Sequence, residues 1–208
     1  MEKQLILTDF GADFTGRQDI SDAFAAACAE AGRRKMPLLI PLGRYKVSKT
    51  LLVPSDCTIL ADDGARIFSD GDMPKRRDDY LLTNADPVGG NRNITIRGGV
   101  WDGNSMGKQN KKPSDIFDPN GFSGVVLNFR NVENLHLSDL IVANAVGYHI
   151  RMAVLSHFVI ENIGFLADHP GATQDGLHFN GEVHDGTGRH IRALSYGLTT
   201  DDLIALNA

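Results

Sequence analysis

The chain has 208 residues, enough for one domain with a substantial core, and 42% hydrophobic and 23% charged residues are ordinary for a soluble globular protein. The net charge is −5, and the lysines and arginines form only short scattered runs, which excludes a nucleic-acid partner. No apolar stretch reaches the length of a membrane span, so we expect no membrane partner. The sequence does not identify the cellular compartment of this soluble chain, and a secreted or periplasmic full-length form is one alternative.

The first 35 residues are expected to form a strand and a capping helix. Ile20, Phe24, Cys28 and Ala31 recur at helical spacing, which predicts an amphipathic helix with one buried face. Cys28 and Cys57 lie in unrelated segments without a metal-ligand spacing, and two cysteines cannot define a disulfide framework. We expect both to be buried thiols.

Short apolar runs follow the helix at tight intervals. Each run is bounded by Gly, Pro, Ser or Asp, which is typical of strands joined by turns, and the runs cover residues 38–40, 45–47, 51–53, 58–60 and 65–67. The 22 glycines against 8 prolines favour the same turn-rich, strand-rich architecture.

Internal repetition indicates how these strands are arranged. Ile150, Leu177 and Ile204 begin three similar segments at a constant offset, because 177 − 150 and 204 − 177 are both 27. Parallel strands one rung apart lie about 4.8 Å from each other, so such residues would stack as ladders inside a solenoid. We therefore predict an all-β fold, a right-handed single-stranded parallel β-helix, as one domain over residues 1–208 with coils from residue 36 onward.

A second series of segments has variable spacing. The same alternating pattern occurs at 93–96, 134–137, 157–160 and 190–193, which predicts that residues 180–188 are a loop insertion. Another loop is expected in the Gly- and Pro-rich stretch 102–124, beside the substrate cleft or at its rim. The last predicted strand, 203–206, is followed by two residues only, which predicts that the C-terminal coils are missing and that the uncapped edge is open to association.

Three aspartates are the candidate catalytic residues. Asp175 and Asp202 are also 27 apart, since 202 − 175 = 27, so they would occupy the same point on successive coils with Asp201 beside them. Strict strand alternation would bury Asp175 and Asp202 with the inward residues, and an unpaired buried carboxylate is costly. The functional interpretation therefore requires a corner at these residues, just before each strand starts, and Gly176 and Thr199-Thr200 are compatible with one. The alternative is that Asp175 lies in a turn and that Asp201 and Asp202 form a solvated strand entry.

The chain resembles polygalacturonase-like glycoside hydrolases (glycoside hydrolase family 28-like) and their relatives in the pectate lyase superfamily. The resemblance runs nearly the whole length and is carried, in order, by Asp9-Phe10-Gly11-Ala12-Asp13, Gly43-Arg44-Tyr45, Gly98-Gly99-Val100-Trp101-Asp102-Gly103-Asn104, Asn144-Ala145-Val146-Gly147-Tyr148-His149-Ile150, Thr173-Gln174-Asp175-Gly176 and Asp201-Asp202-Leu203-Ile204-Ala205-Leu206.

The resemblance implies an inverting hydrolase that acts on a polysaccharide such as the pectin of cell walls. Asp201 would be the general acid, and Asp175 and Asp202 would position and activate water. No metal and no organic cofactor are implied. The family's Asn-Thr-Asp reads Thr-Gln-Asp here, and its later Gly-His-Gly and Arg-x-Lys motifs do not occur after Asp202. We therefore expect weak or no activity from the chain alone.

Two further residues are candidates for substrate binding. Arg151 and His178 are 27 apart and outward by parity, so they could contact a sugar next to the aspartates, or be ordinary surface residues. A non-catalytic carbohydrate-binding or tail-spike-like β-helix would share the scaffold without needing the carboxylates. A polysaccharide lyase, with Arg151 or Arg192 as its base, is a third alternative.

Overall fold

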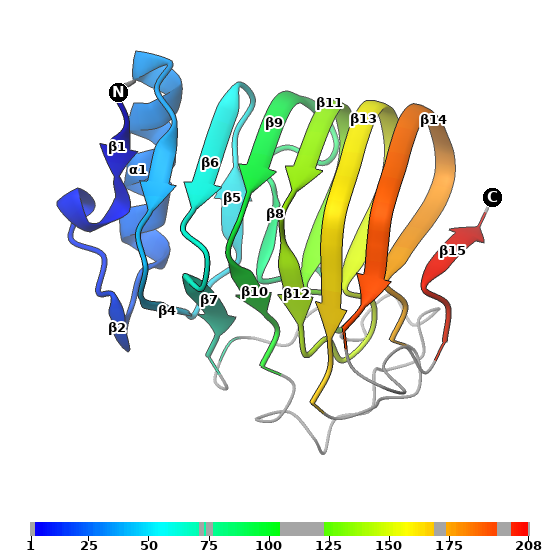
Figure 1. Ribbon diagram of the computed structural model, residues 1–208. Coiled ribbons are helices and arrows are strands. Elements are labelled where there is room, and N and C mark those ends of the chain that lie inside the picture. Colours follow the sequence, from blue (N-terminus) through cyan, green and yellow to red (C-terminus); the bar gives the residue numbers. More distant parts are fainter. Residues whose placement is uncertain are drawn as a thin grey trace.

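The computed structural model describes residues 3–70, 73, 77–104, 123–168, 174–194 and 201–207. Within them the strands pair in parallel and form one sheet that winds into a solenoid. Figure 1 shows the coils stacked side by side, with the N-terminal segment and α1 at one end and β15 at the other. The prediction of a parallel β-helix is confirmed.

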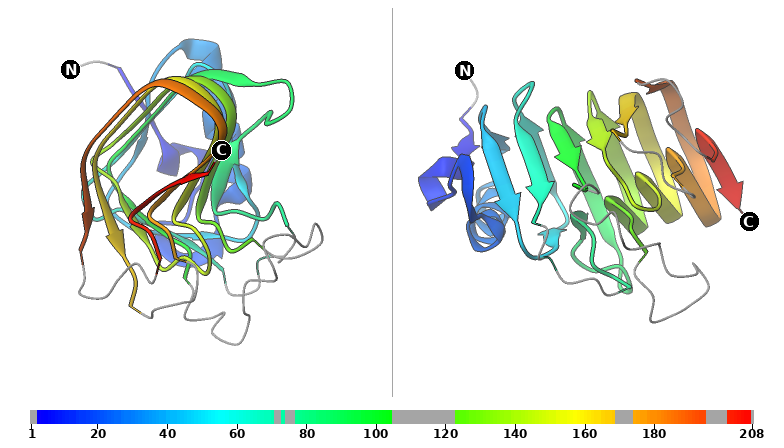
Figure 2. Two further views of the ribbon diagram at one scale, coloured as in Figure 1. Left: turned by 90° about the vertical axis from the view of Figure 1, so that its right-hand side faces the viewer. Right: turned by 90° about the horizontal axis from the view of Figure 1, so that it is seen from below.

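Each coil contributes strands to three faces around a common interior, as the view along the axis shows (Figure 2). The first face consists of β5 (Leu51–Val53), β8 (Leu82–Asn84), the beginnings of β11 (Leu127–Ser138), β13 (Ile150–Leu166) and β14 (Leu177–Ala193), and β15 (Ile204–Asn207). The second face consists of β1 (Leu5–Ile6), β3 (Leu38–Ile40), β6 (Cys57–Ala61), β9 (Asn91–Arg97) and the middles of β11, β13 and β14. The third face consists of β2 (Thr15–Asp19), β4 (Arg44–Val47), β7 (Arg66–Ser69), β10 (Val100–Asp102), β12 (Ile141–Ala143) and the ends of β13 and β14.

A column of polar residues in the left-handed conformation lies on the second face, just before β6 and within β9 and β11. Asp56, Asn93 and Asn134 have φ of 59°, 54° and 60°. Their side chains are linked from coil to coil, because Asn134 Nδ2 donates to Asn93 Oδ1 (2.8 Å) and Asn93 Nδ2 donates to Asp56 Oδ1 (2.6 Å). Asn and Asp tolerate this backbone conformation best among residues with a side chain, so the sequence supplies them where the chain must turn.

The predicted 27-residue register is confirmed on the first face. Ile150 pairs with Leu177, and Leu177 pairs with Ile204. Leu127, Ile150 and Leu177 are at most 1% exposed, so the ladder of like residues forms the interior. Ile204 is 46% exposed, since β15 pairs with β14 alone.

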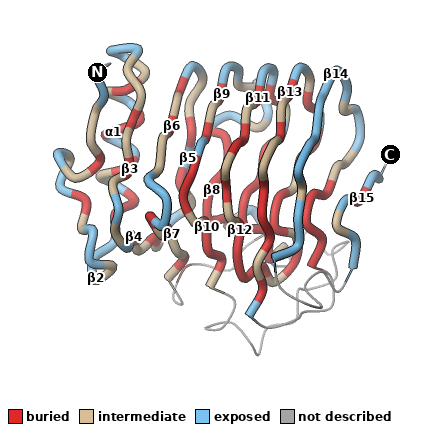
Figure 3. The backbone as a smooth tube through the Cα atoms, in the orientation of Figure 1, coloured by how far each residue is buried: buried red, intermediate tan, exposed pale blue. Residues whose placement is uncertain are grey.

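The predicted loop at 180–188 is wrong. Strand β14 runs unbroken from Leu177 to Ala193, and Phe158 pairs with Gly186 rather than with Ile191, which instead pairs with Ile163. The pairing shifts by one residue between Ala153 and Leu155, and beyond this irregularity the Phe158 ring occupies the space above Gly186, where a Cβ would collide with it. Figure 3 shows that β14 differs from the preceding strands in burial: its middle is mostly exposed, whereas β11 and β13 have regularly spaced buried positions.

Helix α1 (Ser21–Arg34) packs against β1, β3, β5 and β6, with the short helix η1 (Leu7–Phe10) beside it. Its buried face contains Phe24, Cys28 and Ala31, as the spacing predicts. Both Cys28 and Cys57 are buried free thiols.

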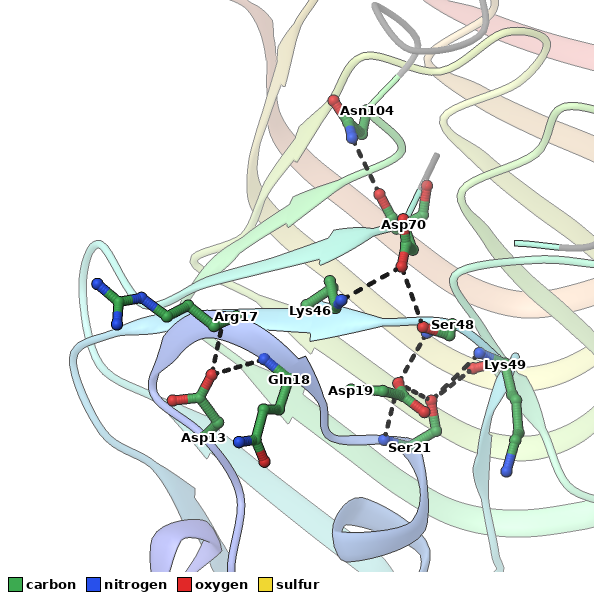
Figure 4. Close-up of polar contacts among 11 residues, drawn as sticks. Asp13, Arg17, Gln18, Asp19, Ser21, Lys46, Ser48, Lys49, Asp70 and Asn104 are labelled. Atoms are coloured by element: carbon green, nitrogen blue, oxygen red, sulfur yellow. Dashed lines mark hydrogen bonds and ion pairs between the residues drawn. The ribbon is translucent and has the colours of Figure 1, made fainter. Parts of the chain in front are cut away.

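The start of α1 is fastened to the third face by a polar network (Figure 4). Asp19 Oδ1 accepts hydrogen bonds from Ser21 Oγ (2.6 Å), Ser21 N–H (3.2 Å) and Ser48 N–H (2.8 Å). Asp19 therefore accepts from the first residue of the helix and links it to the next coil, while the N-cap residue itself is Ile20. In the described part of the chain, no helix is long and apolar enough to cross a membrane.

Candidate active site

The three predicted aspartates converge at the entry to β14 and β15. One carboxylate oxygen from each of Asp175, Asp201 and Asp202 lies within 4.8 Å of the other two. Their environments differ, because Asp175 is 3% exposed whereas Asp201 and Asp202 are exposed. The cluster thus combines one buried carboxylate with two that solvent can reach.

The backbone turns at Gly176, where the functional interpretation requires a corner. The coils stay in hydrogen-bonded register through it, since Gly176 N–H donates to the Asp202 carbonyl (2.9 Å) and Leu177 N–H donates to the Leu203 carbonyl (3.0 Å). A Cβ on residue 176 would lie 2.5 Å from the Leu203 carbonyl oxygen, so glycine allows the coils to approach here. The corner lets Asp175 avoid the apolar interior that strict alternation would impose.

Both carboxylate oxygens of Asp175 are engaged by the protein. His178 Nδ1 lies 2.5 Å from Asp175 Oδ2, and the Asp202 backbone N–H donates to Asp175 Oδ1 at 3.1 Å. The side chains of Asp175 and His178 are each 5% exposed, so this contact is shielded from water. Asp175 therefore joins β14 to the segment that carries Asp201 and Asp202.

His178 is itself held on two further sides. The Tyr148 ring stacks on its imidazole with the centroids 3.8 Å apart and an interplanar angle of 9°. Asn207 Nδ2 lies 3.2 Å from His178 Nε2. Neither Tyr148 nor Asn207 was predicted as a site residue, because nothing in the local sequence indicates that the two meet at one imidazole.

His149 lies directly behind the cluster. It is 0% exposed, and its Nδ1–H donates to the Asp175 carbonyl oxygen at 2.9 Å. Burial lowers the pKa of its imidazole, against the opposing effect of the hydrogen bond to Asp175. A neutral ring that donates from Nδ1 thus fixes the backbone of Asp175 from the interior side.

Arg151 occupies the predicted outward position beside His178. The two residues pair across β13 and β14, and Arg151 Nε donates to Asn180 Oδ1 at 3.0 Å. On the preceding coils the same column continues with Asn128 and Thr83, which are linked by a 3.1 Å hydrogen bond. A polar column therefore runs along the outward side of the first face towards the aspartates, with Thr83, Asn128 and His178 buried and Arg151 partly exposed.

Two tyrosines border this column and respond to its charges. Burial raises the pKa of Tyr148, the negative charges of Asp175 and Asp201 add to that effect, and Arg151 opposes it. Burial, together with the nearby Asp78 carboxylate, raises the pKa of Tyr80 to about 12, again opposed by Arg151.

The described residues show the aspartate cluster as a group that could hold a cation by geometry alone. Exposed carboxylates often gather without an ion, and Asp175 already uses both oxygens within the protein, so we assign no metal to it. Trp101, which an exposed site could use to stack on a sugar, is instead 0% exposed in the core and donates from Nε1 to the Gly98 carbonyl (3.1 Å). The segment 105–122, expected to be a loop beside the site, lies outside the described residues.

No protein-family model and no curated protein matches the chain. Among solved structures, it is similar to the family 28 exopolygalacturonase of Yersinia enterocolitica, with a TM-score of 0.67 and 22% identity over 88% of this chain and 43% of that one. It is also similar to gene product 12 of bacteriophage phi29, with a TM-score of 0.68 and 19% identity over 84% and 24% of the two chains. A third similar structure is an iota-carrageenase complexed to iota-carrageenan fragments, with a TM-score of 0.61 and 16% identity over 93% and 49%.

The chain thus spans between 24% and 49% of the length of these three proteins. At identities below a quarter, such similarity establishes a fold and not an activity. Together with the parallel pairing of all three faces, it shows that the chain has the polygalacturonase-like, right-handed parallel β-helix fold.

Proposed function

We propose that this chain carries the aspartate cluster of a glycoside hydrolase that degrades a polysaccharide. The observation that carries the proposal is the convergence of Asp175, Asp201 and Asp202 within 4.8 Å, with two of the three exposed at the end of an outward polar column. Glycosidic bond hydrolysis needs an acid for the leaving oxygen and a carboxylate for the attacking water, and the cluster contains residues for both tasks.

In the proposed mechanism, Asp201 donates a proton to the glycosidic oxygen. Asp175 and Asp202 orient the water and accept its proton as it attacks the anomeric carbon. No metal or organic cofactor takes part. Arg151, partly exposed in the column that leads to the cluster, would contact the sugar next to the scissile bond.

The stereochemical course is a sharp test of this mechanism. Inverting glycosidases usually separate their two carboxyl groups by about 6.5–9.5 Å, and retaining ones by about 5–5.5 Å. The structure gives only that one oxygen of each carboxylate lies within 4.8 Å of the other two, so the course is tested on the product rather than on this distance. Proton NMR of the first anomer released would separate the two courses.

The polysaccharide itself is part of the proposal. Pectin is the leading candidate, because the fold is shared with an exopolygalacturonase and the polar column contains Arg151, whose guanidinium suits a sugar carboxylate. A polymer of that size is degraded outside the cytoplasm, so we propose a secreted or periplasmic location for the full-length protein.

The test is reducing-sugar release from polygalacturonate, carrageenan and neutral polysaccharides by the purified chain. Asp201→Asn is the critical variant, and Arg92→Gln, at an exposed residue of the second face, is the matched control for loss of a surface charge. Because the chain alone is expected to have little activity, the proposal expects weak release by the wild type and the control, and a loss of at least about 100-fold, to the level of the substrate blank, in Asp201→Asn. Equal rates for wild type and Asp201→Asn would exclude the assigned acid.

A non-catalytic carbohydrate-binding β-helix is the second candidate, favoured by the similarity to a bacteriophage protein of the same fold. It predicts oligosaccharide binding by the wild type and by Asp201→Asn alike, without release of reducing ends. A lyase would instead give a product that absorbs in the ultraviolet through its new double bond. Binding measurements and ultraviolet spectra on the same samples therefore separate the three classes.

A further inference from the structure

The contacts of His178 point to a role other than holding a sugar. The residue is 4% exposed, and its two ring nitrogens face Asp175 and Asn207 while Tyr148 covers one face of the ring. A hydrogen bond from this imidazole to a substrate hydroxyl would have to displace one of these partners. The ring is thus built into the protein rather than presented to solvent.

The identity of its partners determines which ring nitrogen carries the proton. An ionised carboxylate can only accept, so Nδ1 must donate to Asp175 Oδ2 at 2.5 Å. The amide nitrogen of Asn207 can only donate, so Nε2 must accept at 3.2 Å. The surroundings therefore select the neutral Nδ1–H tautomer of His178.

This tautomer fixes the Asp175 carboxylate in one orientation. Oδ2 is held by His178, Oδ1 is held by the Asp202 backbone N–H, and the Asp175 carbonyl is held by His149. Because Tyr148 stacks on the imidazole at 3.8 Å, the ring has little freedom to swing away from the carboxylate. The orientation of Asp175 relative to Asp202 thus depends on His178.

We propose that His178 is a positioning residue, which holds the Asp175 carboxylate in the geometry needed to act with Asp202 on the attacking water. The inference rests on the function proposed above. In this role His178 acts on the substrate only through Asp175, instead of contacting the sugar as the sequence suggests. Loss of His178 should therefore impair the chemical step while substrate binding persists. A displacement of about 1 Å in a catalytic group can cost about 100-fold in rate.

The three informative variants are His178→Ala, His178→Asn and His178→Gln. The amide nitrogen of an asparagine falls near the position of Nδ1 and could still donate to Asp175, whereas that of a glutamine falls near Nε2 and faces Asn207. We expect His178→Ala and His178→Gln to lower kcat by about 10- to 100-fold with KM changed less than about threefold, and His178→Asn to recover most of kcat. A rise in KM at unchanged kcat, or equal loss in all three variants, would overturn the proposal.

A second measurement does not depend on hydrolysis. Nitrogen-15 NMR of the histidine side chains should show His178 protonated at Nδ1 and bare at Nε2, and Asp175→Ala, which removes the acceptor, should abolish that signature. A proton on Nε2 in the wild type would overturn the proposed geometry itself. If the Nδ1–H signature is present but neither this chain nor the full-length protein hydrolyses any polysaccharide, the proposed function fails, and with it the positioning role, leaving a structural hydrogen bond.

Discussion

Replacing the buried Asp175 tests whether its contacts with the protein hold it in place while Asp201 and Asp202 face solvent. Asp175→Ala leaves the His178 Nδ1–H and the Asp202 N–H without their acceptors. Each hydrogen bond to a charged group contributes about 1.5–3 kcal/mol, and the Asp202 N–H is only partly buried, so we expect a combined loss of about 3–5 kcal/mol. That is a large part of the roughly 5–15 kcal/mol by which a domain is stable.

The assay is urea unfolding, followed by circular dichroism and by the fluorescence of the single tryptophan. With a urea dependence of roughly 2–3 kcal/mol per molar, the midpoint of Asp175→Ala should fall by about 1–2.5 M. Asp201→Ala, at an exposed position, is the matched control and should stay within about 0.5 kcal/mol of wild type. Asp175→Asn, which keeps one acceptor oxygen, should fall between the two.

The reasoning is refuted if Asp175→Ala and Asp201→Ala unfold at the same urea concentration. Such a result would mean that the contacts with His178 and with the Asp202 backbone add nothing to the stability of the fold. It would also remove the basis for treating Asp175 as the fixed member of the cluster.

Three further predictions concern the solenoid. Because burial lowers the pKa of His149, this residue takes up a proton at a higher pH in the unfolded chain than in the folded one. The contribution of the neutral His149 to stability is therefore complete above about pH 6.5 and declines as the pH falls below it. The free energy of unfolding, measured against pH, should decline less steeply in His149→Asn. Leu135→Ala, at a fully buried residue, should cost about 2–5 kcal/mol in chemical unfolding, whereas Leu52→Ala, at a residue that is 49% exposed, should cost under about 1 kcal/mol. Gly186→Ala should destabilise by about 1–3 kcal/mol because its Cβ meets the Phe158 ring, whereas Gly188→Ala on the same strand meets nothing within 4 Å; equal melting temperatures for this pair would contradict the register of β14.

The repeat could be predicted from the sequence because the interior of a solenoid requires like residues at a fixed period. The offset of 27 placed Ile150, Leu177 and Ile204 in one ladder, and the structure pairs them so. The same offset brought Asp175 to the level of Asp202. The resemblance to polygalacturonase-like hydrolases then gave the fold, which the similarity to solved structures confirms.

The pairing of the later part of β14 could not be predicted in the same way. The segments 157–160 and 190–193 share one alternating pattern, but a pattern of period two fits many registers equally well. The pairing keeps the offset of 27 as far as Ala153 and Asn180 and shifts to 28 at Leu155 and Val183, so Phe158 meets Gly186, and Ile163 meets Ile191. The glycines of 180–188 therefore predict a loop from the sequence, whereas in the structure Gly186 makes room for the Phe158 ring within a strand.

The sequence by itself thus determined the coil repeat and the convergence of the aspartates, because both follow from a constant offset along the chain. Only the tertiary structure decided which aspartates face solvent: Asp175 is buried, whereas Asp201 and Asp202 are exposed. It also brought Tyr148 and Asn207 onto the His178 ring. These contacts join residues of three successive coils, and their geometry depends on side-chain directions at a backbone corner, which no periodicity in the sequence specifies.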